Sequence, residues 1–162
     1  MAKDLSVFDR FYQKPLRWVA SPEYKIIDNE AVVIGSVSAP SPDFKMAATG
    51  QAGNESWEFL RDEKIAKESG LTRFFVMENS TITGIFEMAP GQSSGKLKLK
   101  SGRLMVWHSF RGKKYYFRWK NRKLVVFNVP KKQIFVETPV EPIEELALVI
   151  IFGLYLVVVL RM

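Results

Sequence analysis

Along most of the chain apolar and polar residues alternate, which is the period of a β-strand with one buried face. In the clearest stretch, Tyr115, Phe117 and Trp119 alternate with polar residues, and residues 96–100 alternate Lys with Leu. Short runs of this kind, separated by turns that contain Asn or Gly, are typical of antiparallel hairpins. The pattern therefore predicts a mainly β protein in which the cations lie on one face of the sheet and the aromatic residues on the other.

Three stretches of the chain resemble one another and predict three similar hairpins. They read YKIIDNEAVVIGSV, FFVMENSTITGIFEM and YFRWKNRKLVVFNV. Each joins an apolar or aromatic strand to a strand rich in β-branched residues through a polar turn that contains Asn. Their spacing of about 45 residues indicates a weak internal repeat of hairpins.

One internal segment has the features of a helix. Asn54 or Ser56 can cap its start, acidic residues crowd its first turns, and Gly70 can end it. We predict a surface helix over about residues 54–69 with a narrow apolar stripe made of Trp57, Leu60 and either Ile65 or Ala66. The preceding residues, 38–53, have little periodicity and predict a loop.

The C-terminal segment has a different pattern, because residues 146–160 carry no charge at all. Glu144 and Glu145 precede this run, where a helix dipole favours negative charge. We predict a helix over about residues 143–161 that is apolar all round and so must be surrounded by protein or lipid. Its enclosed residues are Leu146, Val149, Ile150, Phe152, Leu154, Leu156 and Val158.

Length favours one of three interpretations of this segment. Fifteen helical residues reach roughly 22 Å, whereas a bilayer core of about 30 Å needs about 20 residues. A helix buried in the protein's own fold is therefore favoured over a C-terminal membrane anchor. A third interpretation is a pair of strands with a turn or bulge at Gly153, since β-branched residues favour strands.

A buried helix needs a container with a dry interior. A barrel of about eight strands is filled by its own side chains, so enclosing a helix needs a wider barrel. Counting the short strands gives ten to twelve. We therefore expect a single domain over residues 1–162, a closed antiparallel β-barrel around a hydrophobic C-terminal helix with one extra surface helix.

This pattern resembles the Tubby C-terminal superfamily, in particular its LURP-one-related and phospholipid-scramblase-like branch. The likeness rests on the repeats YKIIDNEAVVIG, FFVMENSTITGIF and YFRWKNRKLVVF and on the ending EELALVIIFGLYLVVV. The resemblance implies a single Tubby-like domain with a closed β-barrel around the C-terminal helix. The chain has no cysteine for palmitoylation and no D-x-D calcium pattern, so calcium-triggered lipid scrambling does not follow from it.

Charge is distributed unevenly. The net charge is +7, yet thirteen Lys and Arg residues and no Asp or Glu lie between Glu87 and Glu137. Such asymmetry is typical of contact with an anionic partner, although a solvated basic face would give the same pattern. The predicted contact residues are Lys96, Lys98, Lys100, Lys114, Arg118, Lys120 and Arg122.

Three functions are compatible with this surface. The favoured one is a binding module for anionic phospholipid headgroups, cytoplasmic and peripheral at a membrane. A second is a tail-anchored, single-pass subunit of a membrane complex. A third is nucleic-acid binding with Tyr116 and Trp119 as stacking platforms, although alternation points Trp119 inward.

We expect no catalysis, cofactor or metal. The chain has one histidine and no cysteine, so a nucleophilic or zinc site lacks its usual residues. His108 shares a strand face with Leu104 and Val106, which predicts a packed or boundary side chain. Paired carboxylates at residues 62–63 and 144–145 are explained by solvation or helix capping.

Overall fold

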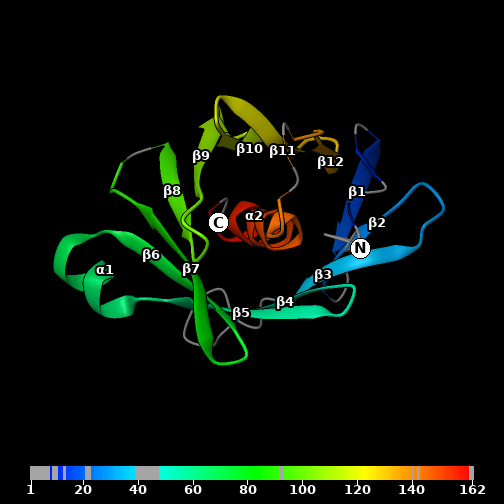
Figure 1. Cartoon of the computed structure of the whole chain (residues 1–162). Helices are drawn as coiled ribbons and strands as arrows, with labels where there is room; N and C mark the ends of the chain where they lie inside the picture. The colour runs from blue at the N-terminus through cyan, green and yellow to red at the C-terminus, as the bar shows by residue number, and fades with distance from the viewer. Residues whose placement is uncertain are drawn as a thin grey trace.

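A computed structural model describes residues 8, 11–12, 14–20, 23–38, 48–91, 93–139, 141 and 143–160. These residues form twelve β-strands and two α-helices (Figure 1). The strands are β1 (Pro15–Ala20), β2 (Tyr24–Ile27), β3 (Val33–Ser38), β4 (Ala48–Ala52), β5 (Glu55–Arg61), β6 (Thr72–Glu78), β7 (Thr81–Met88), β8 (Ser94–Leu99), β9 (Leu104–Phe110), β10 (Lys114–Trp119), β11 (Arg122–Asn128) and β12 (Gln133–Val136). The helices are α1 (Glu63–Ser69) and α2 (Leu146–Leu160).

Each strand pairs antiparallel with the next strand in the sequence, and β12 pairs with β1 to close the barrel. The closing register sets Leu16 opposite Ile134 and Arg17 opposite Gln133. This confirms the predicted closed antiparallel barrel, at the upper end of the expected strand number. Because β1 and β12 pair with each other, the sheet has no unpaired edge strand.

The predicted internal repeat corresponds to the hairpins β2–β3, β6–β7 and β10–β11, which are four strands apart. In each hairpin the register shifts by one residue shortly before the turn. The shifts fall between Ile26 and Ile27, between Val76 and Met77, and between Phe117 and Arg118. Because a bulge bends a strand and increases its twist, three equivalent bulges bend the sheet at three corresponding places around the barrel.

Helix α2 lies inside the barrel (Figure 1). Every residue from Leu146 to Val159 is buried, including all seven that we predicted to be enclosed. The interpretation as two strands is therefore wrong, and the helix begins at Leu146 rather than at residue 143. Residues 142 and 161 lie outside the described residues. Neither described helix is both long and apolar enough to cross a bilayer.

Aromatic side chains fill the space between α2 and the wall formed by β5, β6 and β7. Phe152 packs edge-on against Phe59 at 5.2 Å between ring centroids and against Phe86 at 5.6 Å. One turn later, Tyr155 lies 4.9 Å from Phe59 and 5.3 Å from Phe74. Such pairs add about 0.5–1.5 kcal/mol each beyond the area that they bury.

On its other sides α2 approaches the wall at glycines. A Cβ atom placed on Gly153 would lie 2.7 Å from the ring of Phe127, and one on Gly50 would lie 2.4 Å from the Cγ2 atom of Ile151. Both distances are too short for a real contact. The glycines therefore let α2 lie against β3–β4 on one side and β10–β11 on another.

The predicted surface helix over residues 54–69 is wrong in its first half. Residues 55–61 form β5, in which Trp57 and Phe59 are buried and Glu58 is exposed. Buried and exposed side chains thus alternate as in a strand, and both aromatic rings pack inside the barrel. Only the second half is helical, as α1. The expected apolar stripe is absent, because α1 has no buried residue.

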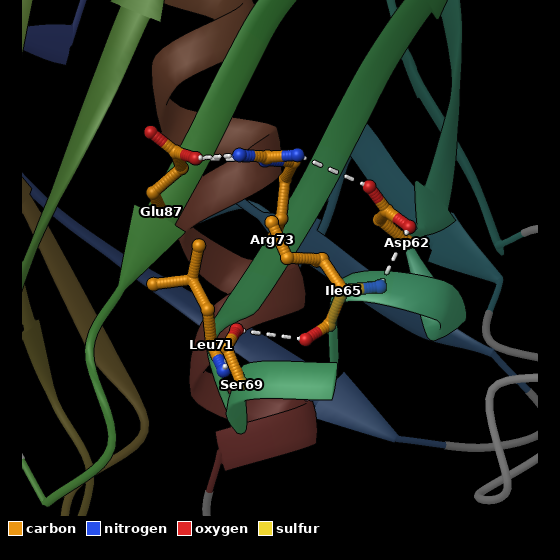
Figure 2. Close-up of polar contacts among 6 residues, drawn as sticks. All are labelled: Asp62, Ile65, Ser69, Leu71, Arg73 and Glu87. Carbon is orange, nitrogen blue, oxygen red and sulfur yellow. Dashed lines mark hydrogen bonds and ion pairs between the residues drawn. The ribbon is translucent and has the colours of Figure 1, made fainter. Parts of the chain in front are cut away.

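Helix α1 is fixed to the barrel through its capping residue. Asp62 accepts a hydrogen bond from the backbone N–H of Ile65 at 3.2 Å, and Gly70 ends the helix with φ of 76°. Arg73 on β6 donates to Asp62 at 3.2 Å and to Glu87 on β7 at 2.7 Å (Figure 2). The predicted start of the helix at Asn54 or Ser56 is therefore wrong, because Asp62 is the cap, whereas its predicted end at Gly70 is confirmed.

The predicted loop over residues 38–53 is also partly wrong, and its residues 39–47 lie outside the described residues. Residues 48–52 form β4, with Ala48, Gly50 and Ala52 facing inward. The sequence ATGQA lacks large apolar residues, so its alternation is invisible to a hydrophobicity pattern. Small side chains are required here because Ile151 of α2 lies against this strand.

Candidate anion-binding surface

The outer faces of β8, β10 and β11 carry five cations, which we call the basic face. These residues are Lys96, Lys98, Lys114, Arg118 and Lys123. They point outward because their sequence neighbours fill the lumen: Leu97 and Phe117 are fully buried. The predicted separation of cations and aromatic residues onto opposite faces is therefore confirmed for β8 and β10.

Strand pairing brings these cations together from distant parts of the sequence. Lys96 and Arg118 both lie opposite Val106, on either side of β9, and Arg118 lies opposite Lys123 of β11. The result is a row of three cations across four strands. The next acidic residue along this row is Glu87, which already pairs with Arg73.

The structure divides the seven predicted contact residues into two groups. Lys96, Lys98, Lys114 and Arg118 lie on the basic face. The others lie at the end of the barrel where α2 enters. There Lys100 and Lys120 occupy turns, and Arg122 begins β11.

Lys120 is engaged locally. Its Nζ atom lies 3.2 Å from a carboxylate oxygen of Glu141 and 4.6 Å from the ring centroid of Trp119. Lys100 lines a hollow with several glutamates, described below. Both are poorer candidates for anion contact than the cations of the basic face.

Sequence reasoning missed Lys123. Regular alternation from Phe127 and Val125 would point Lys123 into the lumen. The bulge in the β10–β11 pair inserts Leu124 as an extra buried residue, so Lys123 faces outward beside Arg118. Because LVVF is an uninterrupted apolar run, the sequence pattern does not show where the inward–outward alternation shifts by one residue.

Tyr116 and His108 form an aromatic pair in the middle of the basic face. Their ring centroids lie 5.1 Å apart at an interplanar angle of 25°, and Lys123 Nζ lies 4.8 Å from the Tyr116 centroid. Both broad sides of Tyr116 therefore have neighbours. Trp119 is buried, as alternation predicted. Neither Tyr116 nor Trp119 therefore offers an open ring face on which a nucleic-acid base could stack.

The electrostatics of His108 agree with its expected boundary position. Burial lowers its pKa below the ordinary value of 6.5, and the positive charge of Arg118 lowers it further. Its Nε2 atom is covered and has no hydrogen-bond partner among the described residues. A neutral ring is thus favoured in the middle of a cationic surface.

A shallow groove of about 270 Å³ runs beside this pair. It is lined by Phe110, Lys114, Tyr116, Lys123 and Val126. Two ammonium groups and two aromatic rings therefore border one small depression. Such a lining suits a ligand that carries both a negative charge and apolar atoms.

At the end of the barrel where α2 enters, carboxylates lie among the cations. A hollow of about 750 Å³ lies there, and its charged lining consists of Glu55, Glu78, Glu144, Glu145 and Lys100. Glu145 is held by Arg103 at 2.7 Å, so this carboxylate has a structural role. Among the described residues no group of His, Asp or Glu side chains is arranged to hold a metal ion.

Comparison with models of protein families, with curated proteins and with solved structures finds no match to this chain. The class that the geometry defines is a closed twelve-stranded antiparallel barrel filled by a hydrophobic helix, with a basic outer face over β8–β11.

Proposed function

We propose that this protein is a non-enzymatic module that binds anionic phospholipid surfaces through the basic face. The observation that carries the proposal is the row of Lys96, Arg118 and Lys123, set in a stretch of forty-nine residues (88–136) without a carboxylate side chain. In this proposal the protein is peripheral at the cytoplasmic side of a membrane, where anionic lipids are concentrated.

The expected strength is modest and depends on salt. Each Lys or Arg near an anionic bilayer contributes about 1 kcal/mol. Five such residues suffice for reversible attachment, and the attraction is screened over about 8 Å at physiological ionic strength. In this proposal membrane contact comes from the barrel surface, because α2 is enclosed by the strands.

We also propose kinship with the Tubby-like, LURP-one-related proteins. Two features support it: the barrel encloses a C-terminal hydrophobic helix, and the three sequence repeats form equivalent bulged hairpins. The kinship extends to fold only. Lipid scrambling is not part of the proposal.

Sedimentation with vesicles tests the function directly. The protein should sediment with vesicles that contain phosphatidylserine, not with pure phosphatidylcholine, and less of it should do so as salt rises. The double substitution Lys96→Ala/Lys98→Ala should weaken binding about tenfold or more. Its control is Lys64→Ala/Lys67→Ala, which removes two exposed lysines of α1 and should leave binding unchanged.

Two results would overturn the proposal. One is equal binding by both double variants, because the attraction would then reflect net charge alone. The other is retardation of single-stranded RNA in a gel with no binding to anionic vesicles, which would make nucleic acid the partner. A requirement for detergent throughout purification would instead favour a membrane-complex subunit.

A further inference from the structure

Phe110, the last residue of β9, is an aromatic side chain exposed to solvent. Its side chain is 58% exposed, more than any other large apolar side chain of the described residues. It lies at the end of the barrel opposite the entrance of α2. The following turn folds back at once, with φ of 55° at Arg111 and 67° at Gly112, and the N–H of Lys113 donates to the Phe110 carbonyl at 3.1 Å.

A second turn touches this one. The N–H of Val129 donates to the carbonyl of Lys113 at 2.8 Å, which joins the β11–β12 turn to the β9–β10 turn. Together the two turns carry five exposed cations on the β10–β12 side of Phe110. These are Arg111, Lys113, Lys114, Lys131 and Lys132. We call Phe110 and these five residues the docking tip.

Other parts of the barrel ends lack this combination. Helix α1 lies at the same end as the docking tip, but its two lysines are balanced by Glu63 and Glu68. The opposite end carries Lys100, Lys120 and Arg122, but Lys120 pairs with Glu141 and Lys100 borders the glutamate-lined hollow. An anionic surface would therefore attract one particular part of one end, which fixes an orientation.

We propose that the docking tip is the membrane-inserting part of the protein: Phe110 enters the bilayer while the five cations meet phosphate and carboxylate headgroups. This rests on the proposed function and adds to it an orientation and an inserted residue. The partner is an anionic lipid bilayer, because an exposed aromatic ring beside a cluster of cations matches its apolar interior and charged surface.

The local geometry agrees with insertion. The guanidinium of Arg111 lies 5.3 Å from the Phe110 ring centroid, so the charge can stay at headgroup level beside the ring. Phe110 and Lys114 also border the groove that continues onto the basic face. Headgroups next to the inserted ring would thus meet Lys114 and Lys123.

A tryptophan reporter tests the insertion. The four natural tryptophans are buried, so an added exposed one is distinguishable. In phosphatidylserine-containing vesicles with brominated acyl chains, Phe110→Trp should shift its emission to the blue and be quenched. The matched control is Val33→Trp, at the end of the barrel where α2 enters, on β3 outside the basic face and 51% exposed, which should do neither.

Binding should follow the same pattern. Phe110→Ala should weaken binding to these vesicles about tenfold or more, and Val33→Ala should leave it unchanged. If anionic vesicles bind the wild type while Phe110→Trp is unquenched, or position 33 is quenched equally, the docking tip is wrong and the proposed function stands. If the wild type binds no anionic vesicle, or binds only single-stranded RNA, both proposals are overturned.

Discussion

The Nη1 atom of Arg103 donates to the Oε1 atom of Glu145 at 2.7 Å. This ion pair joins the turn between β8 and β9 to the residue that precedes α2. Ser101 in the same turn donates to the other oxygen of the carboxylate. The carbonyl of Glu145 in turn accepts from the N–H of Val149 in the first turn of the helix. One glutamate thus attaches the start of the buried helix to the wall.

This attachment should be measurable as a coupling free energy. In a double-mutant cycle, Arg103→Met and Glu145→Gln should show a coupling of about 1 kcal/mol, because both side chains are largely shielded from solvent. The same cycle on Lys120 and Glu141, whose side chains are 61% and 52% exposed, should give less than about 0.5 kcal/mol. Equal couplings in urea unfolding would contradict a special role for the pair at Glu145.

The close approach at Gly153 predicts a strong size dependence. Gly153→Leu should lower the free energy of unfolding by about 3 kcal/mol or more, since the new side chain meets the ring of Phe127. Gly153→Ala should cost less, because alanine favours the helix by about 1 kcal/mol. Chemical denaturation of both variants tests this. A Gly153→Leu variant as stable as the wild type would show that α2 and β11 separate readily.

Removal of α2 should prevent folding altogether. Deletion of residues 143–162 empties a lumen lined by Phe59, Phe74 and Phe86, and the lost apolar contacts cannot be replaced by water. We expect loss of the near-ultraviolet circular dichroism from the buried tryptophans, or aggregation. A truncated chain that unfolds cooperatively in urea would contradict the view that the helix is the core.

His108 should make stability sensitive to acid. Its pKa in the folded state lies below 6.5 because of burial and the charge of Arg118, so the unfolded chain binds the proton more readily. The contribution of His108 to the free energy of unfolding should therefore be complete above about pH 6.5. It should be lost as the pH falls from there through the folded-state pKa. His108→Asn should remove this part of the decline.

The folded-state value can be read directly, because His108 is the only histidine. Its ring resonance should titrate below pH 6.5. In Arg118→Gln the apparent pKa should rise but remain below 6.5, since burial is the larger cause. Titration of the wild type at or above pH 6.5 would contradict the covered position of the ring.

Much of the fold follows from the sequence because the barrel is built from local hairpins. Alternation located the hairpins, and the uncharged run at residues 146–160 required an enclosure that strands of that number can provide. The two errors in the predicted elements, at β4 and β5, have a common cause. β4 has only small inward side chains, and β5 begins with the acidic residues typical of a helix start. In both strands the identity of the inward residues is set by α2, which lies far away in sequence.

The surface was harder to predict than the core. Lys96 and Lys98 follow from simple alternation, but Lys123 depends on a bulge that a run of apolar residues conceals. The docking tip depends on a contact between two turns, Val129 to Lys113. No pattern within either turn indicates that contact.

The position of α2 after all twelve strands has a consequence for biosynthesis. A ribosome makes the chain from its N-terminus, so the wall of the barrel emerges before the element that it must surround. Until α2 is available, the lumen-facing rings of Phe59 and Phe86 lack the cover that Phe152 gives them. The nascent chain thus exposes apolar surface until α2 has been synthesised, and we expect it to be prone to aggregation during that time.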